Sequence, residues 1–488
     1  MTIDAFGSGL ALAERIRNGE VSCVDALEFY LKRAHRFQPT LNAMVEFRED
    51  AARAEARELD AALVRGEIRG PLHGVPMTVK ESYDVAGMRT TRGNVLWKDH
   101  VATTDALSIT RLKRAGVVIF GKTNVPLNLA DFQSYNDIYG TTNNPWDTGR
   151  TAGGSSGGSA VAMAAGLAGV ETGSDIGGSI RNPAHFNGVF GHKPTWGLLP
   201  PLGHGLPDMV AQSDLTVIGP IARSAADLEV LTLAMAGPDE IHAAGYQLAL
   251  QPCPASSLAD LRVAVMTTSD AAPVDAATRS RVELVAKTIA DAGGTVDFDA
   301  RPAFDLAEAH ATYQTLLWSV MASRSTDEAY AELQAQAAAL APDDDSGGAR
   351  LLRAQTATFR DYSAANEART QLRWRWNEFF RGENGYDVLI APMMATAAFP
   401  HDHGPMGGRT ISVDNDTRPY FEQVFWAGLA INSYLPATVI PTGGHPESGG
   451  GLPIGVQLIG PEFGDLKTLG IARLLEAAGF GFTPPPGY

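Results

Sequence analysis

Residues 149–197 read GRTAGGSSGGSAVAMAAGLAGVETGSDIGGSIRNPAHFNGVFGHKPTWG, and they form the most informative part of this 488-residue chain. Glycine and serine are dense here, as they are in flexible linkers. A linker, however, needs neither the apolar run of small residues in the middle nor the charged residues Asp175 and Arg181. Glycines are required where a folded backbone must approach another group closely. We therefore interpret the stretch as folded loops that carry serines.

Around this stretch, short apolar segments alternate with helical ones. Strands are expected at residues 75–79, 117–120, 261–266, 295–298, 388–391, 438–440 and 454–459. Helices are expected at residues 104–115, 156–168, 225–236, 276–292 and 465–478. Such alternation predicts an α/β fold with a central mixed, mostly parallel twisted β-sheet that is covered by helices.

The N-terminal residues are expected to form three helices. Ser8 and Ser22 stand where N-cap residues belong, at the starts of the first two helices. The second helix is expected to end before Pro39, because proline disturbs a helix interior. The third is expected from Glu49 to Val64.

We expect a single domain over residues 1–488, because the sequence shows no internal repeat and no linker between independent units. Its expected parts are an N-terminal helical segment at 1–65, a catalytic core with the Gly/Ser loops at 66–240, a variable helical region at 303–380, and a C-terminal part at 385–488 that completes the sheet. The helical region is expected to be interrupted by a solvated loop at 342–348.

Composition narrows the class of protein. The 39 Lys and Arg residues stand against 55 Asp and Glu residues, which gives a net charge of −16. This excess of acid argues against a nucleic-acid partner, because contacts with phosphates need basic side chains. The N-terminal residues show no basic segment followed by an apolar core, so we expect no secretory leader, and no apolar run is near the ~18 residues of a membrane span. Cys23 and Cys253 form no CxxC pair, so we expect a reducing, cytoplasmic location.

Residues 116–123, GVVIFGKT, match the phosphate-loop pattern GxxxxGK[ST]. That mechanism needs a loop at the four central positions, whereas Val, Val, Ile and Phe are typical of a strand. Pro126 also follows too soon for the helix that should come next. We expect a buried strand that leaves the core at Gly121, and not a nucleotide site.

The segment from Gly153 to Gly157 matches GxSxG, the nucleophile-elbow pattern of α/β-hydrolases. An elbow needs a strand before the serine, and residues 146–152 do not form one in our interpretation. His445 has the chain position of the required base, but nothing else in its loop supports that role. The elbow is kept as a minor alternative.

Histidines offer little support for a metal site. Residues 401–403, His-Asp-His, are potential ligands in a row, but adjacent side chains diverge and no second cluster completes a site. His185, His192 and His204 lie near the Gly/Ser loops, where structural or surface roles account for them. We expect no metal and no cofactor.

Lys80 ends the apolar strand GVPMTVK, and two Gly-rich loops downstream present Ser155, Ser156 and Ser179. Serine is a weak nucleophile until a base takes its proton. A lysine can be that base only when it is neutral, which requires burial or a nearby positive charge. A strand end beneath Gly-rich loops would provide the burial.

These residues resemble those of the amidase signature family. The resemblance covers most of the chain and is carried by the segment at 149–197, by GVPMTVKESYDVAGMRTTRG around Lys80 and by GLPIGVQLIGP near residue 455. It implies that Ser179 is the nucleophile and that neutral Lys80 is the base. Ser155, preceded by a cis peptide bond, would relay the proton to the leaving amine.

The resemblance also implies roles for the neighbours of these three residues. The backbone N–H groups of Ile176, Gly177, Gly178 and Ser179 would form the oxyanion hole, where loss of one donor typically costs about 10²–10³ in rate. Ser156, Ser174, Asp175 and Arg181 would support the loops. The chain has Thr151-Ala152 where a proline often follows the Thr or Ser in relatives.

The implied activity is a cofactor-independent serine amidohydrolase that cleaves amide bonds through an acyl-enzyme on Ser179. Carbamates and esters stay open as further substrates. We expect an uncharged, small and partly hydrophobic molecule in a pocket formed by residues 125–133, 303–380 and 420–426, because apolar side chains gather there. Leu129 falls where relatives place an acyl-pocket residue.

Two alternatives remain for the function. One is an amidotransferase A-type subunit that releases ammonia from glutamine, and the other is a silent binding scaffold with the signature fold. Beyond its small-molecule amide substrate and water, we expect no nucleic-acid or membrane partner. A homodimer stays open as the oligomeric state.

Overall fold

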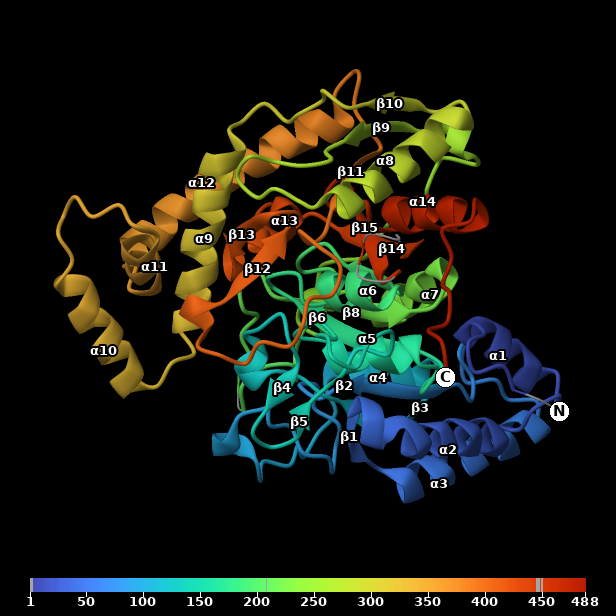
Figure 1. Ribbon diagram of the computed structural model, residues 1–488. Coiled ribbons are helices and arrows are strands. Elements are labelled where there is room, and N and C mark those ends of the chain that lie inside the picture. The colour runs from blue at the N-terminus through green and yellow to red at the C-terminus, as the bar shows by residue number, and fades with distance from the viewer. Residues whose placement is uncertain (1–2, 208, 445–447, 449–450) are drawn as a thin grey trace.

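An eight-stranded sheet runs through the middle of the molecule, in the order β10-β9-β11-β15-β14-β7-β8-β6 (Figure 1). The computed structural model describes residues 3–207, 209–444, 448 and 451–488. The strands of this sheet are β6 (Glu171–Asp175), β7 (Phe190–Lys193), β8 (Val217–Ala222), β9 (Arg262–Val265), β10 (Thr295–Asp297), β11 (Val388–Pro392), β14 (Ala437–Gly444) and β15 (Pro453–Ile459). The expected α/β fold with a central mixed sheet is confirmed.

The sheet is not mostly parallel, and that part of the expectation was wrong. Only β10–β9 and β9–β11 pair in parallel, whereas the other five pairs are antiparallel. A parallel arrangement needs a crossover, usually a helix, after each strand. Within the described residues, β7 is followed by β8, and β14 by β15, without such a helix, so these strands run back beside each other.

Helices cover both faces of this sheet because its strands are apolar on both sides. In β9, Val263 and Val265 pack with α7, α8 and α14, whereas Ala264 belongs to the core on the other side with α5, α6 and α13. These helices are α5 (Gly157–Ala164), α6 (Arg181–Asn187), α7 (Ala225–Met235), α8 (Ala276–Asp291), α13 (Val424–Ile431) and α14 (Asp465–Ala477). The Gly/Ser loops contribute Ala152 and Ile180 to the second of these cores.

A smaller three-stranded sheet places Lys80 in the core. It consists of β1 (Met44–Phe47), β3 (Val118–Thr123) and β2 (Pro76–Lys80), with α4 (Leu107–Arg114) leading into β3. The segment that matches the phosphate-loop pattern is a buried strand here, as expected, although it continues beyond Gly121. Lys122 Nζ donates to Thr90 Oγ1 at 2.8 Å and to the Glu81 carbonyl at 3.2 Å, so this lysine serves the core.

The N-terminal helices are α1 (Gly9–Arg17), α2 (Cys23–Leu41) and α3 (Glu49–Val64). Ser8 and Ser22 accept backbone N–H groups as N-caps, as expected. The second helix does not end before Pro39, which was a wrong expectation. Pro39 lies in its last turn, and Asn42 closes the helix there with a left-handed φ of 45° and an N–H that donates to Gln38.

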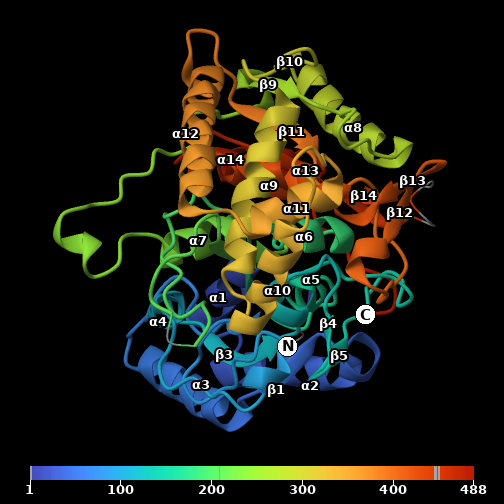
Figure 2. The same cartoon turned by 90° about the vertical axis from the view of Figure 1, so that its left-hand side faces the viewer.

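The region 303–380 is helical and forms one flank of the molecule (Figure 2). Its helices are α9 (Leu306–Ala322), α10 (Asp327–Ala338), α11 (Gly347–Gln355) and α12 (Phe359–Arg381), and α9 packs against α11, α12 and α13. The remaining strands form two hairpins, β4 (Tyr135–Asn136) with β5 (Gly140–Thr141) and β12 (Thr410–Val413) with β13 (Asp416–Pro419). No described helix combines the length and apolar character of a membrane span.

Candidate active site

Lys80 lies fully buried at the end of β2, where its side-chain nitrogen meets three serine hydroxyls. Nζ is 2.7 Å from Ser155 Oγ, 2.9 Å from Ser156 Oγ and 2.9 Å from Ser174 Oγ. No ion pair joins Lys80 to an acidic side chain within the part of the chain that the structure describes. The lysine is therefore solvated by hydroxyl groups alone.

Close backbone packing brings these groups together. β2 lies beside β6, which carries Ser174, and a parallel bridge joins Met77 to Val170. A Cβ atom on Gly154 would stand 2.2 Å from the Asp131 carbonyl oxygen, so only glycine fits before Ser155. The peptide bond from Gly154 to Ser155 is cis, as the family resemblance implied.

Burial lowers the pKa of Lys80 well below its usual range. The positive charge of Arg92 lowers this pKa further, against the opposing effects of Asp175 and Glu81. Both causes disfavour the charged ammonium, as expected for a lysine without an acidic partner in a low-dielectric site. The environment thus favours the neutral amine, which can accept a proton.

Ser179 lies in the loop between β6 and α6, next to this cluster. Its carbonyl oxygen accepts the N–H of Ser156 at 3.1 Å, and the residue is 6% exposed. Ser179 and Ser155 line the same cavity. Within the described residues, the Ser179 hydroxyl has no hydrogen-bond partner, so it is free to meet a ligand in that cavity.

The backbone around Ser179 presents several N–H groups. Gly178 N–H donates to Asp175 Oδ1 at 2.8 Å, so in this structure it is already occupied. None of the hydrogen bonds among the described residues uses the N–H of Ile176, Gly177 or Ser179. Three of the four donors that the resemblance implied for an oxyanion hole are therefore free.

Asp175 and Arg181 form a buried ion pair behind this loop. Arg181 Nε and Nη2 lie 3.1 and 3.2 Å from the two carboxylate oxygens. Burial alone would raise the pKa of Asp175, but the charge and hydrogen bonds of Arg181 bring it below its usual value. Arg181 also donates to Gln457 on β15, which anchors the loop to the central sheet.

Two cavities meet at Ser179. The polar one, about 250 Å³, contains Ser155 and Ser174 on its wall, whereas the apolar one does not. Leu129 and Ile176 line both cavities. The apolar cavity is formed by the three expected segments, with Leu129, Ala130, Asp131 and Phe132 from the first, Leu317, Trp318 and Met321 from α9, and Phe421 and Val424 from the third.

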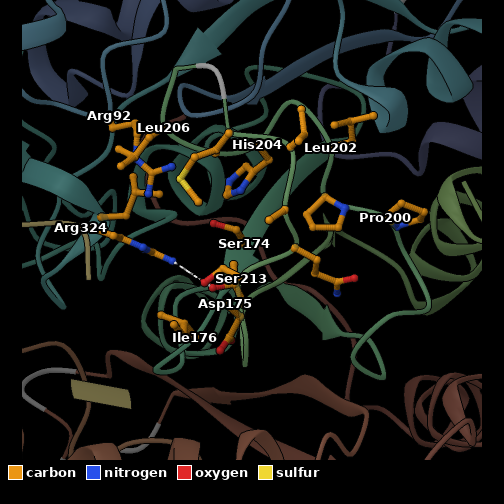
Figure 3. Close-up of a pocket in the computed structure, with 18 of the residues that line it drawn as sticks. Arg92, Ser174, Asp175, Ile176, Pro200, Leu202, His204, Leu206, Ser213 and Arg324 are labelled. Atoms are coloured by element: carbon orange, nitrogen blue, oxygen red, sulfur yellow. Dashed lines mark hydrogen bonds between the residues drawn. The ribbon is translucent and has the colours of Figure 1, made fainter. Parts of the chain in front are cut away.

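Two arginines of the polar cavity were missed by the sequence analysis. Arg92 lies 12 residues after Lys80 in the chain, and Arg324 follows the end of α9 (Figure 3). His204 lines the same cavity, where Ser82 contacts its Nε2 at 2.9 Å. A basic residue in a helical region carries no sequence signal of its own, because most such residues face solvent.

The other histidines near the Gly/Ser loops have structural contacts. His185 contacts the carbonyl oxygens of Gly455 and Thr396, both at 2.9 Å, and His192 contacts Thr438 and Asp465. Among the described residues, no group of three or more potential ligand side chains, including 401–403, could hold a metal ion. His445, the base of the elbow alternative, lies outside the described residues.

Comparisons with known proteins agree on one family. A family model described as Amidase matches residues 25–469. The chain is 33% identical to the A subunit of the glutamyl-tRNA(Gln) amidotransferase of Synechococcus sp. (strain CC9605), over 100% of this chain and 98% of that protein. Human fatty-acid amide hydrolase 2 is 38% identical over 47% of this chain and 45% of its own length. A solved vestigial complex, linked to the evolutionary origins of an s-triazine catabolic enzyme, contains a chain with a TM-score of 0.82 and 29% identity, covering 98% of this chain and 99% of that one.

Asp175→Asn should destabilise the protein by about 3–5 kcal/mol, because it leaves the Arg181 charge buried without a counter-charge. Urea unfolding followed by fluorescence measures this change. Glu378→Gln is the matched control, since it removes an exposed pair with Arg375 that contributes little. Equal unfolding midpoints for the two variants would show that the buried pair does not hold the loop.

Proposed function

This chain belongs to the amidase family, and we propose that it cleaves the C–N bond of a small-molecule amide through an acyl-enzyme on Ser179. The observation that carries the proposal is the 2.7 Å contact between Lys80 Nζ and Ser155 Oγ at the wall of the cavity that Ser179 shares. It joins a base with a lowered pKa to a hydroxyl that can pass a proton on.

Proton transfer begins the proposed reaction. Neutral Lys80 takes the proton of Ser155, which takes the proton of Ser179 as the Ser179 oxygen attacks the carbonyl carbon. The tetrahedral oxyanion then accepts hydrogen bonds from the free N–H groups of Ile176, Gly177 and Ser179. Gly178 is left to position the loop through Asp175.

Collapse of the intermediate breaks the C–N bond. Ser155 gives its proton to the leaving amine and regains one from the protonated Lys80. The acyl group stays on Ser179 until a water molecule, activated through the same relay, attacks the ester. One water is consumed, and an acid and an amine leave the site. Apolar side chains around Leu129 favour a partly hydrophobic acyl group.

A second candidate is the release of ammonia from glutamine by an A-type component of an amidotransferase. The match over the full length of the Synechococcus protein supports it. Under this alternative the same relay would act on the side-chain amide of glutamine, and partner proteins would consume the ammonia.

Glutamine separates the two candidates. The isolated protein should hydrolyse butyranilide or butyramide faster than it hydrolyses glutamine at equal concentration. The release of aniline or ammonia measures these rates. This result is expected because the acyl cavity is lined by apolar side chains. Ammonia release from glutamine alone, with no cleavage of the other amides, would favour the amidotransferase alternative instead.

Ser179→Ala should lower turnover by at least about 10³-fold, since it removes the attacking oxygen. It should also abolish labelling by a fluorophosphonate probe, and peptide mass spectrometry of the wild-type protein should place the adduct on Ser179. Ser22→Ala is the control, because Ser22 caps helix α2 and is distant from Ser179 in the sequence. This variant should retain both the turnover and the labelling. An adduct on Ser155 would support the elbow alternative, and full activity of Ser179→Ala would refute the proposed nucleophile.

The pH dependence should report the neutral form of Lys80. Because burial lowers its pKa, the neutral fraction rises with pH well below the usual lysine value of about 10.4, so the acid limb of kcat/KM should lie far below that pH. Lys80→Met should lose almost all activity, and the exposed Lys32→Met should retain the wild-type profile. A limb near pH 10.4 would contradict a buried neutral base.

A further inference from the structure

Arg92 and Arg324 lie on the same side of the polar cavity, although they come from distant parts of the chain (Figure 3). This cavity also contains Ser155 and Ser179. Neither arginine has an ion-pair partner among the described residues. Two unneutralised guanidinium groups therefore share the space in which the substrate is expected to bind.

Arg92 is held firmly in this position. It is 3% exposed, and its N–H donates to the Glu81 carboxylate at 2.8 Å while its carbonyl accepts the N–H of Asn128 at 2.8 Å. Its φ of 55° is unusual for a residue with a side chain. Its side-chain Nε is buried and, in the described part of the chain, makes no hydrogen bond.

Three other buried arginines form ion pairs with acidic side chains, and Arg92 lacks such a pair. Arg181 pairs with Asp175, Arg369 with Asp214, and Arg409 with Asp131, each at 3.1 Å or less. A buried charge without such a partner is costly to stability. Arg92 therefore has the burial of these residues without their compensation.

Arg324 approaches from the helical flank. Its Nη2 donates to Ser213 Oγ at 3.0 Å and to Thr216 Oγ1 at 3.3 Å, which orients the planar guanidinium group. Burial lowers its pKa, as it lowers that of Arg92 to about 9 with a further effect from the Arg324 charge. The two groups thus repel each other in a poorly solvated site.

Acidic side chains near the cavity are already engaged. Asp175 pairs with Arg181, and Asp239 lies 2.9 Å from the ring nitrogen of His242. The Glu81 carboxylate accepts the backbone N–H groups of Thr91 and Arg92. Glu81 and Asp84 attract the charge of Arg92, but among the described residues neither forms an ion pair with it, so the place for a direct counter-charge between the two arginines is left to a ligand.

We infer that the substrate carries a carboxylate, which binds between Arg92 and Arg324. This inference rests on the proposed function. Guanidinium groups match the planar geometry of a carboxylate and bind it through paired, charge-assisted hydrogen bonds. The buried Nδ1 of His204, which has no partner among the described residues, lines the same cavity as a further polar atom.

The two cavities decide which half of the substrate carries this charge. Ser155 gives its proton to the leaving amine, and Ser155 lines the polar cavity with the arginines but not the apolar one. The amine half therefore lies beside Arg92 and Arg324, and the acyl half lies against Leu129 and Trp318. The substrate class is an N-acyl amino acid with an apolar acyl group, in place of the uncharged molecule that the sequence suggested.

N-butyrylglycine and N-butyrylglycinamide form the matched pair for the test, because they differ only at the carboxylate. We expect kcat/KM to be about 10–100-fold higher for the acid, the value of one or two hydrogen bonds to a charged group. Equal values for the two amides would overturn the inference while leaving the proposed function intact. Succinamate carries its carboxylate on the acyl half. Its kcat/KM should exceed that of butyramide by a smaller factor than the factor between N-butyrylglycine and N-butyrylglycinamide. A larger factor for succinamate would overturn the assigned orientation.

Variants connect the preference to the two arginines. Arg324→Gln should reduce the acid-over-amide ratio to within about 3-fold, mainly through KM, and Arg324→Lys should restore part of it. Arg375→Gln, on the exposed face of α12, is the control that keeps the wild-type ratio. An unchanged ratio in Arg324→Gln, with Ser179 still labelled by the fluorophosphonate probe, would overturn the assignment of this residue.

Protection of Ser179 provides a readout that needs no turnover. N-butyrylglycine should slow fluorophosphonate labelling at a lower concentration than N-butyrylglycinamide, and inorganic phosphate should protect less than either. Equal protection by both amides would overturn the inference, and better protection by phosphate would replace the carboxylate site by a general anion site. Absence of labelling at Ser179 without any ligand would instead refute the proposed function.

Discussion

A lysine that is buried without an acidic partner is the constraint on which the centre of this protein depends. Lys80 has only hydroxyl groups around its Nζ atom, supplied by Ser155, Ser156 and Ser174. Three short side chains can reach one nitrogen only if their backbones come very close. Gly173 meets this requirement, because a Cβ atom there would stand 2.8 Å from Ser156 Oγ, and Gly154 packs closely on the backbone of Asp131. Composition, loop shape and the lowered pKa of the lysine thus have one common cause.

The arginines inside this molecule are compensated in different ways, and the buried Arg223 is held by backbone carbonyl oxygens. Arg181 has a carboxylate beside it and fixes the loop that carries Ser179. Arg92 and Arg324 have none within the described residues, and they face a cavity. Among the described residues, Arg92 and Arg324 differ from these structural arginines because neither a carboxylate nor a set of backbone carbonyl oxygens compensates their charge. The partners of each buried charge therefore indicate a ligand site here better than the positions of the basic residues do.

Every strand that the sequence analysis expected is present in the structure, but strands that lie beside the Gly/Ser loops were missed. Lys80, Ser155 and Ser179 were singled out because their motifs are local, and the expected strands β2, β3, β9, β10, β11, β14 and β15 because their residues are apolar. β6, β7 and β8 were missed, since ETGSD, FGHK and VIGPIA contain glycine, proline or charged residues that their burial on both faces tolerates. The strand directions and the meeting of Arg92 with Arg324 depend on tertiary packing, of which the single sequence holds no local sign.

The attachment of Arg92 to Glu81 has a consequence for how such an enzyme can change. Glu81 directly follows Lys80, so one short piece of backbone carries the lysine of the serine cluster and the anchor of Arg92. Because this hydrogen bond uses the backbone N–H of Arg92, the chain keeps its position beside Glu81 whichever side chain follows from residue 92. Arg324 instead follows α9, in the helical region 303–380. A substitution at either arginine can therefore change the charge of the cavity wall, while the backbone that carries the inner one is fixed together with the core.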